Sequence, residues 1–189
     1  MNGIVVYSSQ TGFTEKYAKW IAEDLNCEAI PVKQAKKLDI SKFDTVIYGG
    51  WCMAGSVNGL KWLLDRIPSL ANANKKFAVY AVGGSPMENP DLEQGLKNIE
   101  GKIQAAIPEN LEKESLYKLI YCPGGFNYDK MKTGSKLMMK MFVGMLKSKE
   151  NKTQADEEMI KMISSNYDIS DKKYIKPILD FVKSKDKKG

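Results

Sequence analysis

The sequence of 189 residues contains no histidine and only three cysteines. Without histidine there is no Ser-His-Asp triad, no imidazole base and no imidazole metal ligand, so other groups or a cofactor must carry the chemistry. Cys27, Cys52 and Cys122 are widely spaced, which favours free thiols in a reducing cytoplasm over a disulfide framework or a zinc site. No apolar run reaches the ~20 residues that cross a bilayer, and the N-terminus has no secretory pattern. We therefore expect a cytoplasmic protein.

The composition itself, with 43% hydrophobic and 28% charged residues, is typical of a globular protein. The length fits one domain, which we place at 1–184, with a disordered tail at 185–189. The net charge is +6, and all of the excess lies in residues 126–189, which hold 15 lysines against 9 acidic residues. This segment is either a solvated lysine-rich surface or a basic face for an anionic ligand, partner or membrane. We predict no nucleic-acid partner.

Apolar, β-branched runs alternate with helical patterns along the chain. The runs predict strands at 3–8, 28–32, 44–50, 76–84 and 117–125. The helical patterns lie at 13–25, 57–67, 91–106, 135–147, 154–164 and 171–184. Near-continuous apolar strands that alternate with helices are typical of a parallel sheet covered on both faces. The predicted fold is therefore a doubly wound α/β domain with five parallel strands and a C-terminal helical extension.

In such a sheet, ligands bind beyond the carboxyl ends of the strands. The first strand is followed by "SQTGFT", where a helix begins, so unpaired N–H groups and the helix dipole favour an anion there. Ser9, Thr11 and Thr14 add hydroxyl groups, and Gly12 allows close approach of the backbone. The stretch matches neither a P-loop nor a dinucleotide motif, and it has no lysine. This favours a phosphate held by neutral donors and not transferred, with simple helix capping as the alternative.

The stretch Ser9-Gln10-Thr11-Gly12-Phe13-Thr14 resembles the T/S-x-T-G-x-T phosphate loop of the flavodoxin family. The resemblance implies strand order 2-1-3-4-5 and FMN bound by this loop. It also implies that Trp51, in the loop after the third strand, stacks on the flavin ring. The remaining residues that would line the cofactor are Gly50, Cys52, Met53, Ala54, Gly55, Gly83, Gly84 and Ser85. Of these, Cys52 is interpreted as lining without a redox role, and Gly83 to Ser85 as backbone donors to the pyrimidine edge.

The sequence after the fifth strand resembles the C-terminal portion of the menaquinone-dependent protoporphyrinogen dehydrogenase branch of flavodoxin-like proteins, and the similarity to this branch runs from the first strand to about Val182. There an aromatic and basic segment leads into a Met- and Lys-rich helix and then an acidic-start helix. The resemblance implies a tetrapyrrole (a porphyrinogen, haem or bilin) or a quinone as small-molecule partner. The substrate residues would be Phe126, Tyr128, Lys130, Lys132 and Met138. The methionines of 136–149 are interpreted as core and edge, with a lipid, quinone or tetrapyrrole surface, and hence peripheral membrane contact, as the alternative.

These patterns together predict an FMN-dependent oxidoreductase in which the flavin carries the chemistry, without a catalytic side chain or a metal. One alternative is a flavodoxin-type electron carrier that serves redox partner proteins. The basic charge argues against it, because carriers of that family tend to be acidic. A second alternative is a flavin reductase that depends on NAD(P)H or a quinone, although no nicotinamide motif is evident.

Overall fold

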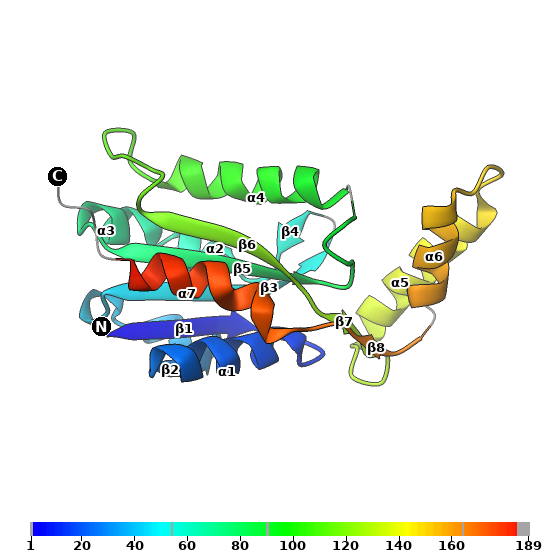
Figure 1. Ribbon diagram of the computed structural model, residues 1–189, viewed down its shortest axis with the longest axis horizontal. Helices are drawn as coiled ribbons and strands as arrows, with labels where there is room; N and C mark the ends of the chain where they lie inside the picture. Colours follow the sequence, from blue (N-terminus) through cyan, green and yellow to red (C-terminus); the bar gives the residue numbers. More distant parts are fainter. Residues whose placement is uncertain (1, 54, 90, 164, 185–189) are drawn as a thin grey trace.

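The centre of the molecule is a parallel sheet whose strands follow the order β2-β1-β3-β5-β6 (Figure 1). The computed structural model describes residues 2–53, 55–89, 91–163 and 165–184, so the predicted tail at 185–189 lies outside it. The parallel strands are β1 (Gly3–Ser8), β2 (Glu28–Pro31), β3 (Thr45–Met53), β5 (Lys76–Gly83) and β6 (Tyr117–Pro123). Since β5 and β6 are the fourth and fifth parallel strands, the predicted order 2-1-3-4-5 is confirmed.

The third strand is longer than predicted. It continues through Trp51 to Met53 and turns back into β4 (Ser56–Val57), which pairs with it antiparallel. The turn includes Gly55, whose φ of +70° suits glycine. The segment after Gly50, which was predicted as a loop, is therefore the end of a strand and a hairpin, because aromatic and apolar residues follow Gly50 and extend the strand. Ala54 lies outside the described residues.

Helices cover both faces of the sheet. The first face carries α1 (Phe13–Leu25) and α7 (Lys176–Lys183), and the opposite face carries α2 (Lys61–Leu64), α3 (Ile67–Asn72) and α4 (Asp91–Ala106). Two predicted helices are interrupted. The pattern at 57–67 is a turn with Gly59 at φ +74°, followed by α2 and by α3, which has a proline in its first turn. The pattern at 171–184 begins as the 3₁₀ helix η3 (Lys172–Ile175) before α7.

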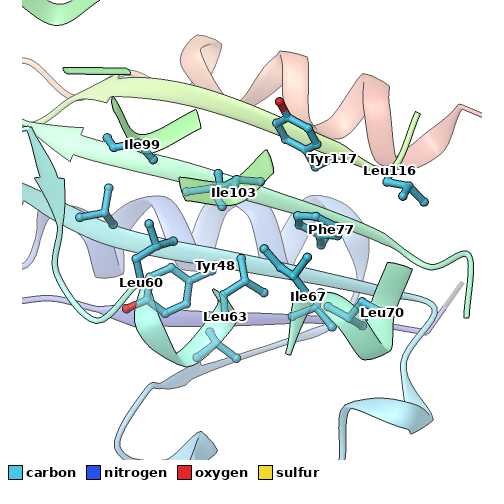
Figure 2. Packing of buried hydrophobic residues seen from close by; sticks show 14 of the residues in the cluster. Tyr48, Leu60, Leu63, Ile67, Leu70, Phe77, Ile99, Ile103, Leu116 and Tyr117 are labelled. Carbon is cyan, nitrogen blue, oxygen red and sulfur yellow. The ribbon is translucent and has the colours of Figure 1, made fainter. Parts of the chain in front are cut away.

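The core is divided by the sheet because side chains of a strand alternate between its faces. Tyr48 packs with Leu63, Phe77 and Ile103 under α2 to α4, as Figure 2 shows, whereas Ile47 faces α1 and α7. Two short 3₁₀ helices, η1 (Gln34–Lys37) and η2 (Ile40–Lys42), connect β2 to β3 and were not predicted. Both faces of the sheet are therefore closed, and its carboxyl edge is left for a site.

A helical hairpin interrupts the fold between β6 and η3. It consists of α5 (Thr133–Ser148) and α6 (Gln154–Ile163), which project away from the sheet in Figure 1. At its base, β7 (Gly125–Phe126) pairs antiparallel with β8 (Tyr167–Asp168). Because α7 packs on β6 and α1, the last helix belongs to the covered sheet. The predicted C-terminal extension is thus an inserted hairpin followed by a helix of the fold.

Candidate functional site

The predicted binding segments meet at one edge of the sheet. Ser8 at the end of β1 is in register with Gly50, Trp51 is in register with Val82, and Gly83 is in register with Pro123. The chain segments that follow β1, β5 and β6, together with the β3–β4 hairpin, therefore lie side by side at the carboxyl edge. This is the edge at which ligands bind in open parallel sheets.

The loop Ser9–Thr14 presents a cluster of unpaired backbone donors. Gly12 is the N-cap of α1 with φ 102°, and it provides no capping side chain. Several N–H groups find no acceptor among the described residues, including those of Gln10, Thr11, Phe13, Thr14 and Glu15. Such N–H groups at a helix start form a site for an anion, with the positive end of the helix dipole behind them.

Two hydrogen bonds fix the shape of this loop, one within the loop and one to a core side chain. The Gly12 N–H donates to Ser9 Oγ at 3.2 Å, which closes the loop on itself. Beneath it, the fully buried Tyr80 donates its hydroxyl to the Thr14 carbonyl at 3.3 Å. Thr14 is itself only 2% exposed, so of the three hydroxyls those of Ser9 and Thr11 are the more accessible. The loop is therefore preorganised by the core.

The lysine nearest to this loop in sequence is already engaged. Lys16 Nζ lies 2.8 Å from Asp168 Oδ2 and 2.7 Å from Ser170 Oγ, and it sits over the Trp20 ring. Its charge is thus balanced by β8 and the segment after it. An anion bound at this loop would therefore be held by neutral donors, and the sequence prediction of such a site stays a prediction.

The β3–β4 hairpin brings Trp51 and an unpredicted asparagine to the site. Trp51 is half-buried, and its carbonyl accepts from the Asn58 N–H at 2.9 Å. The Asn58 side chain accepts from Ser8 Oγ at 2.6 Å, which joins this hairpin to the end of β1. At Gly50, a Cβ would lie 2.4 Å from Val57, so glycine is needed for β4 to fold back. Gly55 lies beside α4, where a Cβ would come 3.7 Å from Asn98.

Cys52 is half-buried and packs against the core on the face of α2 to α4. Burial raises the pKa of its thiol to about 12, so the sulfur is protonated at neutral pH. A protonated thiol is a poor nucleophile, which supports its interpretation as lining. The Met53 side chain lies outside the described part of the structure.

Two tyrosines hold the segment after β5. The Tyr167 hydroxyl donates to the Gly84 carbonyl at 2.5 Å, and the Tyr121 hydroxyl donates to the Ser85 carbonyl at 2.7 Å. The N–H groups of Gly84 and Ser85 have no acceptor among the described residues. The carbonyl groups of Gly84 and Ser85 therefore already accept hydrogen bonds, whereas their N–H groups remain available to a ligand that carries acceptor atoms.

An aromatic cluster covers the base of the hairpin. The Phe126 ring lies 6.3 Å from that of Tyr128 and 5.6 Å from that of Tyr167. A Cβ at Gly84 would fall 2.2 Å from the Phe126 ring, so Phe126 packs directly on this glycine. Phe13 likewise packs near Gly125, where an added Cβ would be 2.9 Å from its ring. Both phenylalanines thus have packing roles that the sequence did not predict.

The helical hairpin contacts the phosphate-binding loop directly. Gln10 and Ser135, in the first turn of α5, exchange hydrogen bonds of 3.0 and 3.2 Å. Lys130 and Lys132 precede this turn and are exposed. Met138, one turn further along α5, is 54% exposed. The predicted substrate residues are thus distributed from the edge of the sheet onto α5.

Sequence reasoning missed four residues of this region: Asn58, Tyr80, Ser135 and Tyr167. Each acts through a contact with a residue distant in sequence, and none belongs to a local motif. Two shallow concavities lie elsewhere, one lined by Lys118, Lys173 and Phe181 and the other by Asn2, Cys27 and Phe43. Neither includes a residue of the predicted site, so the site is identified by its donors and its place on the sheet.

The comparison with known families agrees with this geometry. The sequence model of the family described as Flavodoxin domain matches residues 4–154. The chain belongs to this flavodoxin domain family. The matched range includes the loop Ser9–Thr14, all of the parallel sheet except Gly3, and α5. No curated protein matches the chain at a significant level.

Solved structures with a similar arrangement include several flavodoxins. Oxidised flavodoxin 1 of Bacillus cereus is 15% identical, with 77% of this chain and 95% of that chain covered and a TM-score of 0.44. The WrbA-like flavodoxin of Agrobacterium tumefaciens is 16% identical, with coverage of 86% and 95% and a TM-score of 0.45. A mutant flavodoxin of Fusobacterium nucleatum bound to flavin mononucleotide is 13% identical, with coverage of 62% and 75% and a TM-score of 0.41. Since these TM-scores are low, the family assignment rests on the family match.

Proposed function

We propose that this flavodoxin-domain protein binds FMN and acts as an FMN-dependent oxidoreductase in the cytoplasm. The observation that carries the proposal is the lysine-free loop Ser9–Thr14, in which the N–H groups of Gln10, Thr11, Phe13 and Thr14 have no acceptor among the described residues. A phosphate monoester brings two negative charges and several acceptor oxygens, which suit these donors. The three thiols are free, which supports a reducing compartment.

The ring of the cofactor would lie along the same edge of the sheet. Trp51 offers a half-buried aromatic surface, and the N–H groups of Gly84 and Ser85 offer donors to the carbonyl oxygens of the ring. The bound flavin would supply electron and hydride transfer, which no side chain of this site provides. The protein would position the ring and hold Cys52 protonated beside it.

Thr11 provides the test of FMN binding. Thr11→Val removes a hydroxyl donor to a dianion at nearly constant volume, which costs ~1.5–3 kcal/mol, or about ten- to a hundredfold in affinity. Thr11→Ser keeps the hydroxyl and should retain most of the affinity. Both are measured by titrating the FMN-free protein with FMN and following flavin fluorescence. Equal affinities of the wild type and Thr11→Val would contradict the assignment of this loop.

For the substrate, we propose a tetrapyrrole, in line with the resemblance of the last third to the protoporphyrinogen dehydrogenase branch. The cluster of Phe126, Tyr128 and Tyr167 supports this proposal, because a flat macrocycle stacks on aromatic rings. The exposed Lys130 and Lys132 nearby suit the propionates of such a ring. Since exposed charge pairs are each worth less than ~1 kcal/mol, most of the affinity should come from the macrocycle.

The substrate test uses reduced protein under anaerobic conditions. The protein is mixed in turn with haem, a bilin and protoporphyrin, and flavin and Soret absorption are followed together. Replacing Lys130 and Lys132 by glutamine should weaken binding only modestly and flatten its dependence on salt. Replacement of Lys36 and Lys37, in η1, makes the same change of charge away from the proposed contact. Failure of all three compounds to change the spectra would exclude a tetrapyrrole as electron acceptor of the reduced protein.

An electron carrier is the second candidate, and membership of the flavodoxin domain family favours it. In that role the carboxyl edge would dock on a redox partner protein instead of holding a substrate. Rapid electron exchange between the reduced protein and a redox protein, with no reaction of any tetrapyrrole, would establish the carrier. Turnover of a tetrapyrrole with first-order dependence on the protein would establish the enzyme.

A further inference from the structure

Helix α5 carries an unusual surface for a helix that faces solvent. Its exposed large apolar side chains are Leu137, Met138, Met141, Phe142 and Met145, which are 61%, 54%, 68%, 38% and 57% exposed. At about 100° per residue, these positions fall within an arc of about 140°, so they form one stripe. Among the described residues, Met87 is the only other exposed large apolar side chain. The apolar exposure of the molecule is thus concentrated on α5.

The hairpin does not need this stripe for its own packing. Leu146 of α5 and Ile163 of α6 are 5% and 1% exposed, and Met139 is half-buried on the side of α5 away from the stripe. The turn is closed separately: Lys149 Nζ lies 2.7 Å from Asp156, which also accepts from the N–H and hydroxyl of Thr153. The apolar stripe is therefore the free face of a hairpin that is already closed.

The charge on α5 has a single sign. The helix contains Lys136, Lys140 and Lys147 and no acidic residue. All three lysines lie on the side of α5 opposite the stripe, where Lys140 and Lys147 are exposed and Lys136 is half-buried. A helix with Phe and Leu on one face and lysines on the opposite face is the pattern of a helix that lies in the interface of an anionic bilayer.

We propose that α5 docks this protein peripherally on an anionic lipid bilayer, with the stripe in the interface and the lysines at the headgroups. No helix among the described residues is long and apolar enough to span a membrane, so the contact is interfacial. A second copy packed on the stripe would make no use of the three lysines, whereas an anionic bilayer attracts them within a Debye length. Docking on lipid does not depend on FMN.

Docking through α5 would place the bilayer near the loop Ser9–Thr14. The first turn of α5 is hydrogen-bonded to this loop through Ser135 and Gln10. A bilayer bound along α5 would thus lie beside the carboxyl edge of the sheet. Lipophilic molecules dissolved in the bilayer would reach that edge without crossing water.

The first test is sedimentation of the full chain with vesicles, with and without FMN. The vesicles contain either phosphatidylcholine alone or an equal mixture of phosphatidylcholine and phosphatidylglycerol. We expect binding to the anionic vesicles, weakening as salt is added. Met141→Glu should lower the affinity about tenfold or more, whereas Met87→Glu, the same change at an exposed methionine outside α5, should leave it within about twofold. Absence of binding by the wild type, or equal loss in both variants, would overturn the proposal.

The lysines allow a second matched comparison. Replacing Lys136, Lys140 and Lys147 by glutamine should lower the affinity for anionic vesicles roughly a hundredfold, at about fivefold per lysine. Replacing Lys33, Lys36 and Lys37, which are exposed between β2 and β3, makes the same change of net charge. This control should lose less than about threefold. If the two triple variants lose affinity equally, the contact is not made by α5.

Loss of binding in a variant could also result from misfolding, so one variant is chosen to add a fluorescence signal on binding. Met141→Trp keeps an apolar side chain in the stripe, so it should bind anionic vesicles at least as well as the wild type. Its emission should shift to shorter wavelength when vesicles are added, and Lys36→Trp should show no shift. The molar mass without lipid is measured in parallel. A dimer that Met141→Glu converts to a monomer, together with no blue shift of Met141→Trp, would assign the stripe to a second copy and overturn docking on lipid.

Discussion

Gly49 of β3 lies at a contact that connects the core to the phosphate-binding loop. A Cβ at this position would be 1.8 Å from Cζ and 2.2 Å from Cε2 of Tyr80. Tyr80 is fully buried, and its hydroxyl donates to the Thr14 carbonyl. The ring therefore has no free space into which to move, and Gly49→Ala must displace it. We expect this single methyl group to disturb both the stability of the fold and the loop.

The loss of stability in Gly49→Ala can be estimated from the overlap between the added methyl group and the Tyr80 ring. Ordinary contact begins near 3.4 Å, so the methyl group requires a shift of more than an ångström in a closely packed interior. Overpacking by smaller amounts costs ~1–3 kcal/mol, and we expect the free energy of unfolding to fall by about 3 kcal/mol. For a domain of this size that lowers the Tm by about 6–12 °C. FMN affinity should fall as well, because the Thr14 carbonyl loses its support.

Denaturant unfolding of the wild type and four variants measures this. Gly101→Ala, in a helix where a Cβ meets nothing within 4 Å, is the matched control and should stabilise by about 0.5–1 kcal/mol. Tyr80→Leu removes the clashing ring, so in Gly49→Ala/Tyr80→Leu the methyl group should cost much less than in the wild type. An unchanged stability of Gly49→Ala, or additive effects in the double variant, would refute the packing argument.

The remaining predictions concern the hairpin and the cofactor. Lys149 and Thr153 hold the pKa of Asp156 at about 2, below its unfolded value of ~3.9. Its stabilisation of the hairpin should be complete above pH ~4 and disappear as the pH falls toward 2, and Asp156→Asn should remove this dependence in hydrogen exchange. Ser135→Ala should speed exchange in the first turn of α5 by about two- to tenfold without changing global unfolding. The potential of bound FMN should be less negative than in acidic flavodoxins and vary with ionic strength, as redox titration would show.

Local patterns were sufficient to predict the elements nearest to the site. The strand at 3–8 and the helix at 13–25 have the bounds of β1 and α1. This succeeded because the apolar run and the helical spacing are each uninterrupted, and the polar loop separates them. The strand order was implied by the family resemblance and not by periodicity. Hydrogen bonding in the sheet confirms it.

The β3–β4 hairpin shows where the pattern misled. The strand was predicted to end at Gly50, with Trp51 in a loop, yet β3 continues to Met53 and the turn comes at Gly55. Gly49 and Gly50 lie within the strand. Glycine is required at both positions because a side chain at Gly49 would collide with Tyr80 and one at Gly50 with Val57. Glycine thus marked close packing in one place and a turn in another, and the sequence does not distinguish these two uses.

Contacts between distant segments were not predictable at all. Gln10 and Ser135 are 125 positions apart, and the hydrogen bond of Tyr167 to Gly84 spans 83. The methionines of α5 were expected to divide between core and edge, but Met139 is only half-buried and Met138, Met141 and Met145 are exposed. Helical spacing gives the relative direction of such side chains. Only the placement of α6 decides which direction is inside.

The place of the insertion in the chain explains how one sheet can serve different partners. The hairpin leaves the fold after β6 and returns before η3, and β7 and β8 pair at its base, so the ends of the insertion are held together. A closed base of this kind lets an insertion vary in length at small entropic cost, and the core is not disturbed. Because Phe126 of β7 packs on Gly84 and Ser135 of α5 contacts Gln10, whatever α5 binds would be brought beside the proposed anion site. If both proposals hold, cofactor binding is set by the strand ends and the choice of partner by the inserted hairpin.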